Sequence, residues 1–443
     1  MMRRLAAVLF VFAAGCHRST FDRTSGKIQL AAGVTEITAP LRIAAGAHDL
    51  EIAGDPGGST IRMAANFAGA AAIVGDNVAN VTIHGIRIEG SRTSLGSDRY
   101  LPGSDQPFAD YYDANGILFR NSRNIAIRDV TIEKIKSFPI LVNQSTGVTI
   151  ENVAIANSGT LNKAGRSNTT GGILLEEGTT EFAVRRCRIH DITGNGIWTH
   201  AYYHSPRNVD GVIESNEVSA TPRDAIQVGH GRHVRVAGNH GSRIGYPPDE
   251  IDTAALATPV ALDSAGDVTG SVYTDNHFID VNGQCIDLDG FHDGEVSGNS
   301  CINRQPIEAY PFLHEGIVFG NTFPDQTPGR VLVKGNVIDG FGYGGVYLIG
   351  EGSEIVDNRF VNINMSHCTG RAGNARCNYA LDEPGMLRSG IYLATHAARP
   401  AQTRGNVIER NYISGFGSKQ WCIEPAASIA LNDVGENTCI DQK

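Results

Sequence analysis

Ile173-Leu174-Leu175-Glu176 is followed along the chain by Ile197-Trp198-Thr199-His200 and then by Ile226-Gln227-Val228-Gly229. The first and third residues of each segment are almost all apolar, which is the period of a β-strand with one buried face. The pattern recurs in four more segments, Ile117-Leu118-Phe119-Arg120, Ile140-Leu141-Val142-Asn143, Val260-Ala261-Leu262-Asp263 and Ile286-Asp287-Leu288-Asp289. Their starts lie 23 to 34 residues apart, a spacing typical of one coil of a solenoid.

Positions two and four of each segment are expected to face outward. Stacked coils place equivalent residues about 4.8 Å apart. The fourth positions would then form one row: Arg120, Asn143, Glu176, His200, Gly229, Asp263 and Asp289. We expect this row to be the functional surface.

A second repeat follows these strands, in which a turn Asn precedes alternating apolar residues, as in Asn216-Glu217-Val218 and Asn276-His277-Phe278. Asn tolerates the left-handed backbone angles of a tight turn. Further copies begin at Asn299, Asn321, Asn336, Asn358 and Asn411. Each coil should therefore contain two or three short strands joined by turns.

The composition agrees with many short strands and tight turns. The 443 residues include 52 Gly, and aromatic residues make up only 7 %. The net charge is −10, which argues against nucleic acid as a partner. The chain also lacks the Ala, Glu, Lys and Leu richness of a helical protein.

Residues 27–443 resemble the right-handed parallel β-helix of the pectin-lyase-like superfamily, on the basis of the coil length, the turn Asn and the repeated strands. The resemblance implies an all-β fold, with one β-helix, an N-terminal cap and long insertions at 92–113, 241–259 and 368–387. That superfamily contains lyases, hydrolases, epimerases, tailspikes and adhesins, so the resemblance implies a glycan-related protein without naming the reaction.

The N-terminus carries a targeting segment. Arg3 and Arg4 precede an apolar run that is too short to span a bilayer, and the run ends at Ala13-Ala14-Gly15-Cys16. This segment resembles a bacterial lipoprotein signal with Cys16 as the lipidated residue; an ordinary cleaved signal peptide is the alternative. We therefore expect residues 1–15 to be a signal peptide and 16–26 a tether. The protein would be exported and anchored to a membrane of the cell envelope, with His17 permitting the outer membrane.

Export makes disulfides available to the remaining cysteines. The pairs closest in sequence are Cys368 with Cys377 and Cys422 with Cys439, and we expect these two bridges. Cys187 and Cys301 each fall within a strand and are interpreted as small buried residues. No cysteine spacing with His partners predicts a structural metal site.

The densest group of candidate catalytic residues is the segment around Asp287 and Asp289. These two outward carboxyl groups are two residues apart, about 6.5 Å along a strand. Asp263 is expected beside Asp289 on the preceding coil. Paired carboxylates can share the acid, base and nucleophile roles of glycoside cleavage, and crowding of like charges raises the pKa of one of them. Outward positions that are simply polar are the alternative.

Several other residues are candidates for substrate binding. Gly229-His230-Gly231 is similar to the Gly-His-Gly loop of polygalacturonase-type glycosidases. That family has Asn-Thr-Asp and Asp-Asp before this loop and Arg-Ile-Lys after it. Both earlier motifs are missing here, and Gly245 follows Arg243-Ile244, so only His230 is carried over as a candidate.

Trp198 is placed to stack on a sugar ring, and Arg120 could bind a sugar carboxylate. Alternatively, Trp198 is covered by a neighbouring insertion and Arg120 is simply solvated. The remaining candidates for substrate contacts are Glu176, His200, Gln227, His292, Asp293 and Tyr310.

Three functions compete. The first is a polysaccharide hydrolase that uses Asp263, Asp287 and Asp289. The second is a lyase or epimerase on uronate polymers, for which Asp287 and Asp289 would need to bridge a calcium ion because the row offers Arg120 as its only cation. The third is a glycan-binding lipoprotein without activity. No phosphate-binding loop or dinucleotide fingerprint is present, so we expect no cofactor, with calcium as the one exception.

Overall fold

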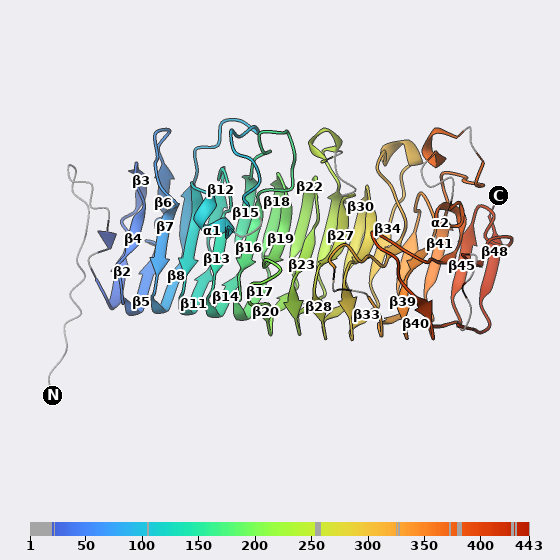
Figure 1. Cartoon of the computed structure of the whole chain (residues 1–443). Helices are drawn as coiled ribbons and strands as arrows, with labels where there is room; N and C mark the ends of the chain where they lie inside the picture. The colour runs from blue at the N-terminus through green and yellow to red at the C-terminus, as the bar shows by residue number, and fades with distance from the viewer. Residues whose placement is uncertain are drawn as a thin grey trace.

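Each coil of the chain contributes strands to parallel sheets that run along the length of a rod (Figure 1). The computed structural model describes residues 20–21, 23–103, 106–252, 258–324, 326, 328–371, 374–378, 383–426, 429 and 432–442. The expected all-β fold is confirmed: the chain forms one right-handed parallel β-helix.

Three long sheets make up the rod. Sheet A contains β1 (Thr20–Phe21), β4 (Leu41–Ile43), β7 (Ala71–Asp76), β10 (Asn115–Arg120), β13 (Ile140–Asn143), β16 (Gly171–Glu176), β19 (Asn195–His200), β23 (Ile226–Gly229), β27 (Val260–Ala265), β31 (Gln284–Leu288), β35 (Ile317–Val318), β38 (Val346–Leu348), β42 (Ile391–Leu393) and β46 (Ile423–Pro425). Sheet B contains β2 (Gly26–Gln29), β5 (His48–Ala53), β8 (Ala79–His84), β11 (Arg123–Arg128), β14 (Thr146–Glu151), β17 (Thr180–Arg185), β20 (Asn208–Val209), β21 (Val212–Glu214), β24 (Gly231–Arg232), β25 (Arg235–Ala237), β28 (Val268–Thr269), β29 (Val272–Thr274), β32 (Phe291–His292), β33 (Glu295–Ser297), β36 (Leu332–Lys334), β40 (Glu354–Val356), β44 (Val407–Glu409) and β47 (Asp433–Val434). Sheet C contains β3 (Gly33–Ile37), β6 (Ser59–Met63), β9 (Ile86–Glu89), β12 (Thr131–Glu133), β15 (Ala154–Ser158), β18 (Arg188–Ile192), β22 (Glu217–Thr221), β26 (His240–Ile244), β30 (His277–Val281), β34 (Ser300–Ile302), β37 (Val337–Asp339), β41 (Arg359–Ile363), β45 (Tyr412–Gly415) and β48 (Thr438–Asp441). A separate pair is formed by β39 (Gly350–Glu351) and β43 (Thr403–Arg404).

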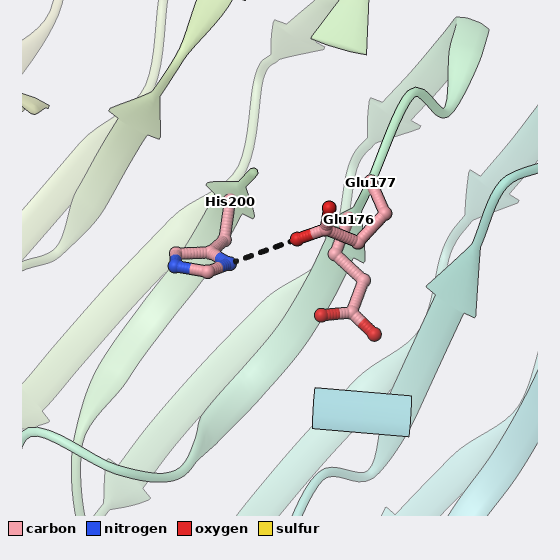
Figure 2. A group of neighbouring side chains, drawn as sticks. All are labelled: Glu176, Glu177 and His200. Atoms are coloured by element: carbon pink, nitrogen blue, oxygen red, sulfur yellow. Dashed lines mark ion pairs between the residues drawn. The ribbon is translucent and has the colours of Figure 1, made fainter. Parts of the chain in front are cut away.

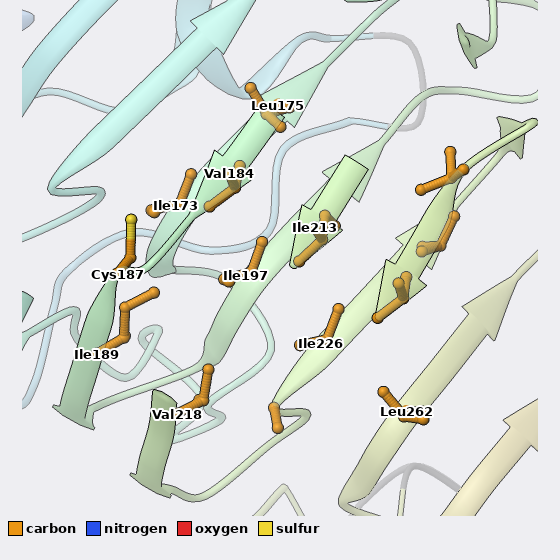
Figure 3. Packing of buried hydrophobic residues seen from close by; sticks show 14 of the residues in the cluster. Ile173, Leu175, Val184, Cys187, Ile189, Ile197, Ile213, Val218, Ile226 and Leu262 are labelled. Atoms are coloured by element: carbon orange, nitrogen blue, oxygen red, sulfur yellow. The ribbon is translucent and has the colours of Figure 1, made fainter. Parts of the chain in front are cut away.

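The core is a stack of aliphatic side chains enclosed by the three sheets. Ile173, Ile197 and Ile226 come from successive strands of sheet A and lie in register, as Figure 3 shows. They meet residues from sheets B and C such as Ile213 and Val218, and all five are buried. Removal of this apolar surface from water is the main force that stabilises the rod.

Asn side chains, all but the last of them buried, form a ladder between sheets B and C. Each Asn donates to the side-chain oxygen of the Asn one coil further on, as in Asn276 Nδ2 to Asn299 Oδ1 at 2.8 Å. The ladder comprises Asn216, Asn239, Asn276, Asn299, Asn336, Asn358, Asn411 and Asn437. Asn321 was predicted to be another turn Asn, but it follows sheet A and binds the backbone oxygen of Arg399, so that prediction was wrong.

The outward face of sheet A carries a continuous line of side chains in register, here called the outer row. Its members are Val74, Leu118, Leu141, Leu174, Trp198, Gln227, Asp263, Asp287, Val318, Tyr347 and Tyr392. The prediction that Asp263 lies beside Asp289 was wrong, because Asp263 pairs with Gln227 on one side and with Asp287 on the other.

Insertions join the sheets and cover parts of the rod. α1 (Phe108–Tyr111) belongs to the insertion at 92–113, and α2 (Gly385–Arg388) begins within the last residues of the insertion at 368–387. Three short 3-10 turns are η1 (Pro248–Glu250), η2 (Ile307–Ala309) and η3 (Ala375–Cys377). α1 packs on the outward face of sheet A, where Phe108 and Ala109 join Leu118, Leu141 and Leu174 in a second apolar cluster.

Three disulfides tie the C-terminal part of the chain. Two are the expected pairs, Cys368–Cys377 and Cys422–Cys439. The third, Cys285–Cys301, joins sheets A and C within one coil. Cys187 and Cys301 are both buried, as expected, and Cys187 is free, whereas Cys301 forms a bridge that the sequence had not indicated.

The N-terminal signal and Cys16 lie outside the described residues. Sheet A already begins at β1, inside the segment that was expected to be a tether. Among the described residues, no helix combines the length and apolar character needed to cross a membrane.

Candidate functional site

The outer row changes character halfway along the rod. Leu118, Leu141, Leu174 and Trp198 are followed by Gln227 and then by Asp263 and Asp287 in direct register. Further carboxyl groups surround this point. Asp224, Asp263, Asp287, Asp289 and Glu315 are here called the acid cluster.

Hydrogen bonds hold the inner part of the acid cluster in place. Gln227 Nε2 donates to Asp224 Oδ2 at 3.2 Å and also to Asp263 Oδ2. Asn195 Nδ2 donates to Gln227 Oε1 at 3.1 Å, which fixes the orientation of that amide. Asp224 Oδ1 accepts from the backbone of Val260 at 3.0 Å. Asp224, Gln227 and Asp263 are all buried, so this part supports the site from below.

The outer part of the acid cluster reaches solvent. Asp287 and Asp289 are half-buried, as are their neighbours Ala265, Val318 and Gly320. These five residues are here called the opening. Asp289 Oδ1 accepts from the backbone N–H of Thr322 at 2.7 Å. Asp287 Oδ1 is itself buried and has no hydrogen-bond partner among the described residues, so the exposed part of this residue lies elsewhere on it.

Burial and mutual repulsion keep protons on the acid cluster. Burial raises the pKa of Asp287 well above its usual range, and the carboxyl groups of Asp289, Asp224 and Glu315 raise it further. Burial likewise raises the pKa of Asp263 well above its usual range, followed by repulsion from Asp224 and Asp287. Burial raises the pKa of Asp289 less, because the Thr322 N–H and the Arg399 charge oppose the shift. The cluster therefore contains groups of different acidity side by side.

Trp198 was expected to stack on a sugar, but its faces are already covered. Its side chain is outward, yet only 7 % exposed, because Phe108 of α1 packs edge-to-face on it at 5.2 Å between ring centroids. Phe138 contacts the same ring at 6.4 Å. Trp198 therefore anchors α1 and offers no surface to a ligand.

Glu176, Glu177 and His200 lie close together, as Figure 2 shows, and could offer ligand atoms within 4.8 Å of one another. However, both oxygens of Glu176 accept backbone N–H groups of α1, from Phe108 at 3.0 Å and Ala109 at 2.7 Å. Burial raises the pKa of Glu176 to about 7. The expected contact of Glu176 with substrate is wrong, because this carboxyl group is fully buried and caps α1.

Two further residues of the same row, His200 and Arg120, complete the attachment of α1. His200 stacks on the Phe108 ring with 4.8 Å between centroids, and its Nδ1 lies 3.5 Å from Glu177 Oε1. Arg120 donates to the backbone oxygen of Ala109 and lies 3.5 Å from Asp110. Both side chains were expected to bind substrate, and both instead contact the insertion.

The other predicted binding residues lie away from the outer row. His230 is buried, and its Nδ1 accepts from the backbone of Asp267 at 3.2 Å. Burial lowers its pKa to about 4, so it is neutral at physiological pH. His292 and Asp293 lie at the sheet B side, where Asp293 pairs with Arg330 at 2.5 Å. His230 packs edge-to-face on the Phe323 ring with 4.9 Å between centroids, and none of the three residues belongs to the acid cluster.

Tyr310 was expected to close one side of the groove, which is wrong. It is fully buried in the core cluster, and its hydroxyl donates to Asp280 at 2.5 Å. Gln227, in contrast, does lie within the site. The predicted row of Glu176, His200, Asp263 and Asp289 is therefore not one open ladder, although Glu176 and His200 are in register.

Sequence reasoning missed three polar residues next to Asp287. Asp224, Gln284 and Glu315 each lie three residues before an outer-row member and are buried beside the sheet. The signal was present, because a polar residue repeatedly stands two positions before the Ile that opens a strand. Thr322 was missed as well, because its backbone N–H reaches Asp289 only through the path of the loop that contains it.

A cavity of about 450 Å³ lies elsewhere, between the insertion at 92–113 and the rod. Arg99 and Lys136 line it together with Asp98, Asp113 and Tyr112. Arg99 is paired with Asp113 and is held by the backbone oxygen of Tyr111. The acid cluster is not part of this cavity, and we take the acid cluster as the candidate site on chemical grounds.

Comparisons with known proteins support the fold. A family model described as a right-handed β-helix region matches residues 71–246. No curated protein sequence matches the chain. A Dettilon tailspike protein superposes with a TM-score of 0.50 at 16 % identity, over 92 % of this chain and 62 % of that one. The chain therefore spans less than two thirds of that tailspike.

Two further solved structures are similar. A Yersinia enterocolitica family 28 exopolygalacturonase gives a TM-score of 0.50 at 10 % identity, over 76 % of this chain and 70 % of that one. A tailspike protein mutant of E. coli bacteriophage HK620, in complex with a pentasaccharide, gives 0.57 at 12 % identity, over 93 % and 72 %. Together with the sheet topology, these matches establish that the chain has the right-handed parallel β-helix fold.

Proposed function

We propose that the protein is a glycoside hydrolase that cleaves a polysaccharide or oligosaccharide at the acid cluster. The observation that carries this proposal is the in-register contact of Asp263 with Asp287, beside the half-exposed Asp289. Proteins of the same fold include an exopolygalacturonase and a tailspike in complex with a pentasaccharide, which supports a glycan as the substrate class.

Asp287 is proposed as the general acid. Burial and the surrounding carboxyl groups raise its pKa, which favours the protonated form, and the residue is half-buried at the opening. In the reaction, Asp287 gives its proton to the glycosidic oxygen while the bond from that oxygen to the anomeric carbon breaks. The leaving sugar departs as a neutral alcohol, and Asp287 becomes a carboxylate.

Asp289 is proposed as the second carboxyl group. It lies two residues further along the chain, roughly 6.5 Å away, and the Thr322 N–H and Arg399 favour its ionised form. As a carboxylate it either removes a proton from the attacking water or attacks the anomeric carbon itself. Both routes consume one water: in the first, the proton taken up by Asp289 must then pass through solvent to Asp287, and in the second, Asp287 recovers its proton from the water that cleaves the bond between Asp289 and the sugar.

Asp263 is proposed as a positioning residue. It is 7 % exposed and is held by Gln227, so it lies behind Asp287 and not beside the substrate. Asp263 stands in register beside Asp287 on the preceding strand, so its proposed role is to orient the Asp287 carboxyl group.

A panel of soluble polysaccharides, including polygalacturonate, alginate, dextran and an O-antigen polysaccharide, tests the reaction. New reducing ends are measured for the wild type, Asp287→Asn and Asp289→Asn. We expect cleavage of at least one polymer, with losses of about 10²–10⁴-fold in each variant. Asp293→Asn is the control, since Asp293 is an exposed carboxyl group that pairs with Arg330 and is not part of the acid cluster.

Three results would contradict the proposal. Cleavage by both variants at the wild-type rate would remove the acid cluster from the mechanism. Unsaturated products that absorb ultraviolet light, formed without the uptake of water, would indicate a lyase. Binding of a glycan with no turnover of any polymer would indicate a binding protein.

We also propose that the protein is exported and anchored by a lipid on Cys16. The Ala13-Ala14-Gly15-Cys16 segment and the three disulfides support export into an oxidising compartment. Labelling with radioactive palmitate should mark the wild type but not Cys16→Ala, and the variant should leave the membrane fraction. Equal labelling of both proteins would refute the anchor.

A further inference from the structure

We propose that the acid cluster receives the end of a glycan chain and not an internal segment, so that the protein is exo-acting. This inference rests on the proposed glycoside hydrolase function and adds the part of the substrate that is recognised. It follows from the way in which the face of sheet A is closed around the opening.

The outer row shows where a chain could lie along the rod. From Val74 to Tyr392, only Asp287 and Val318 are more than marginally exposed among the described residues. Adjacent positions of the row are about 4.8 Å apart. The accessible stretch is therefore short compared with a polymer that runs along the sheet.

The insertion at 92–113 closes the N-terminal side. Phe108 packs on Trp198, and the N-terminus of α1 is held by Glu176 through two backbone N–H groups. Tyr202 adds a hydrogen bond from its hydroxyl to the backbone oxygen of Gln106. These contacts fix the cover on the sheet, so a chain cannot extend past Trp198.

A second cover closes the C-terminal side. Gly385 of α2 lies so close to Tyr392 that an added Cβ would sit 2.3 Å from its ring. The Tyr392 hydroxyl donates to Glu383 at 3.0 Å, and Tyr347 donates to the backbone oxygen of His396. Arg388 binds both oxygens of Glu424 at 2.8 and 2.9 Å, which fastens α2 to β46. A chain cannot extend past Tyr347 either.

The side of the opening next to sheet C is closed as well. The residues three positions before each outer-row member are buried from one cover to the other: Asn195, Asp224, Val260, Gln284, Glu315, Gly344 and Ser389. This boundary leaves no exit for a chain that crosses the sheet.

The only open direction among the described residues leads toward sheet B. There the opening continues through Ala265, Asp289 and Gly320 to Thr322 and the half-buried ring of Phe323. A site that is closed on three sides can admit a chain terminus but not the middle of a chain. Phe323 is positioned to stack on the sugar that follows the cleaved bond.

The first experiment compares viscosity with bond cleavage, using any polymer of the panel that the wild type hydrolyses. Random cleavage by mild acid treatment of the same polymer is the reference. We expect viscosity to fall far less than in the reference at an equal number of new reducing ends. One short product should accumulate from the earliest time point.

The outcomes separate the two proposals. A viscosity loss that follows the random reference would overturn exo-action while leaving the hydrolase function intact. Absence of cleavage across polymers and their oligosaccharides of two to six sugars would overturn the hydrolase function, and exo-action with it.

The second experiment tests the direction of entry. Phe323→Ala should raise KM for oligosaccharides about threefold to tenfold, with a smaller change in kcat, because one stacking contact is lost. Tyr100→Ala is the matched control, since Tyr100 is an exposed aromatic residue on the insertion at 92–113. An unchanged KM in Phe323→Ala would contradict entry from the sheet B side.

Discussion

The N-terminal and central parts of the outer row have the same backbone but opposite chemistry. Leu118, Leu141 and Leu174 are fully buried beneath α1, whereas Asp287 stands half-exposed a few coils further on. The difference shows that the β-helix supplies only a regular set of outward positions. Side chains and insertions decide whether such a position is stabilising or chemically active.

A carboxyl group placed in the covered part of the outer row should cause the largest loss of stability. Leu174→Asp would bury an unpaired charge under Phe108 and Ala109 and lose apolar packing. We expect a loss of at least about 4 kcal/mol in the free energy of unfolding, from the midpoint of guanidinium unfolding.

The matched change in the open part should cost much less. Val318→Asp adds a carboxyl group at a half-exposed position of the same row. Solvent can hydrate that charge, so the loss in the free energy of unfolding should stay below about half of the loss caused by Leu174→Asp. Equal losses at the two sites would show that the covered and open parts do not differ as described.

The pH dependence of the free energy of unfolding should reveal the cost of ionising the buried carboxyl groups of the acid cluster. The pKa of Asp263 is raised in the folded protein, so the native state binds more protons than the unfolded state. Stability is then highest below the unfolded pKa of about 3.9 and falls as pH rises from there toward the folded value. Asp263→Asn should flatten this fall and stabilise the protein at pH 8 by on the order of 1–2 kcal/mol.

Thermal unfolding from pH 4 to pH 8 measures this effect. Asp293→Asn is the control, because Arg330 lowers the pKa of Asp293 and its contribution therefore disappears as pH falls. A steeper decline in Asp263→Asn than in the wild type would contradict the assignment.

Loss of the attachment of α1 should cause the smallest loss of stability. Glu176→Ala leaves the N–H groups of Phe108 and Ala109 without their acceptor. We expect a local loss of about 1 kcal/mol, measured as faster hydrogen exchange at those two amides. Asp110→Ala should change the exchange less, since that residue forms only an exposed ion pair. Unchanged exchange in Glu176→Ala would mean that apolar packing alone holds α1.

The sequence predicted most of the rod but not the surfaces that cover it. The alternation of apolar residues identified the inward face, and Arg120, Asn143, Glu176 and His200 are in register as expected. That α1 occupies this face could not be predicted, because burial of Trp198 depends on a loop whose path is set by tertiary contacts. Polar residues such as Glu176 therefore looked like a binding surface.

The register of Asp263 shows the limit of pattern reasoning. Val260-Ala261-Leu262 and Leu262-Asp263-Ser264 both place alternate side chains inward, so alternation alone does not choose between them. The structure aligns Leu262 with Ile226 and Ile286, and Ser264 is satisfied inside by the Tyr273 hydroxyl at 2.9 Å. A shift of two residues keeps the face and changes only the neighbours.

The sequence by itself determined that the chain forms a parallel β-helix and that Asp263, Asp287 and Asp289 face outward, because a period of two is a local property of a strand. Only the tertiary structure decided which carboxyl groups touch and which part of the face remains open. Those features depend on insertions of variable length, and the packing of Phe108 and Gly385 against sheet A is not encoded in any repeat.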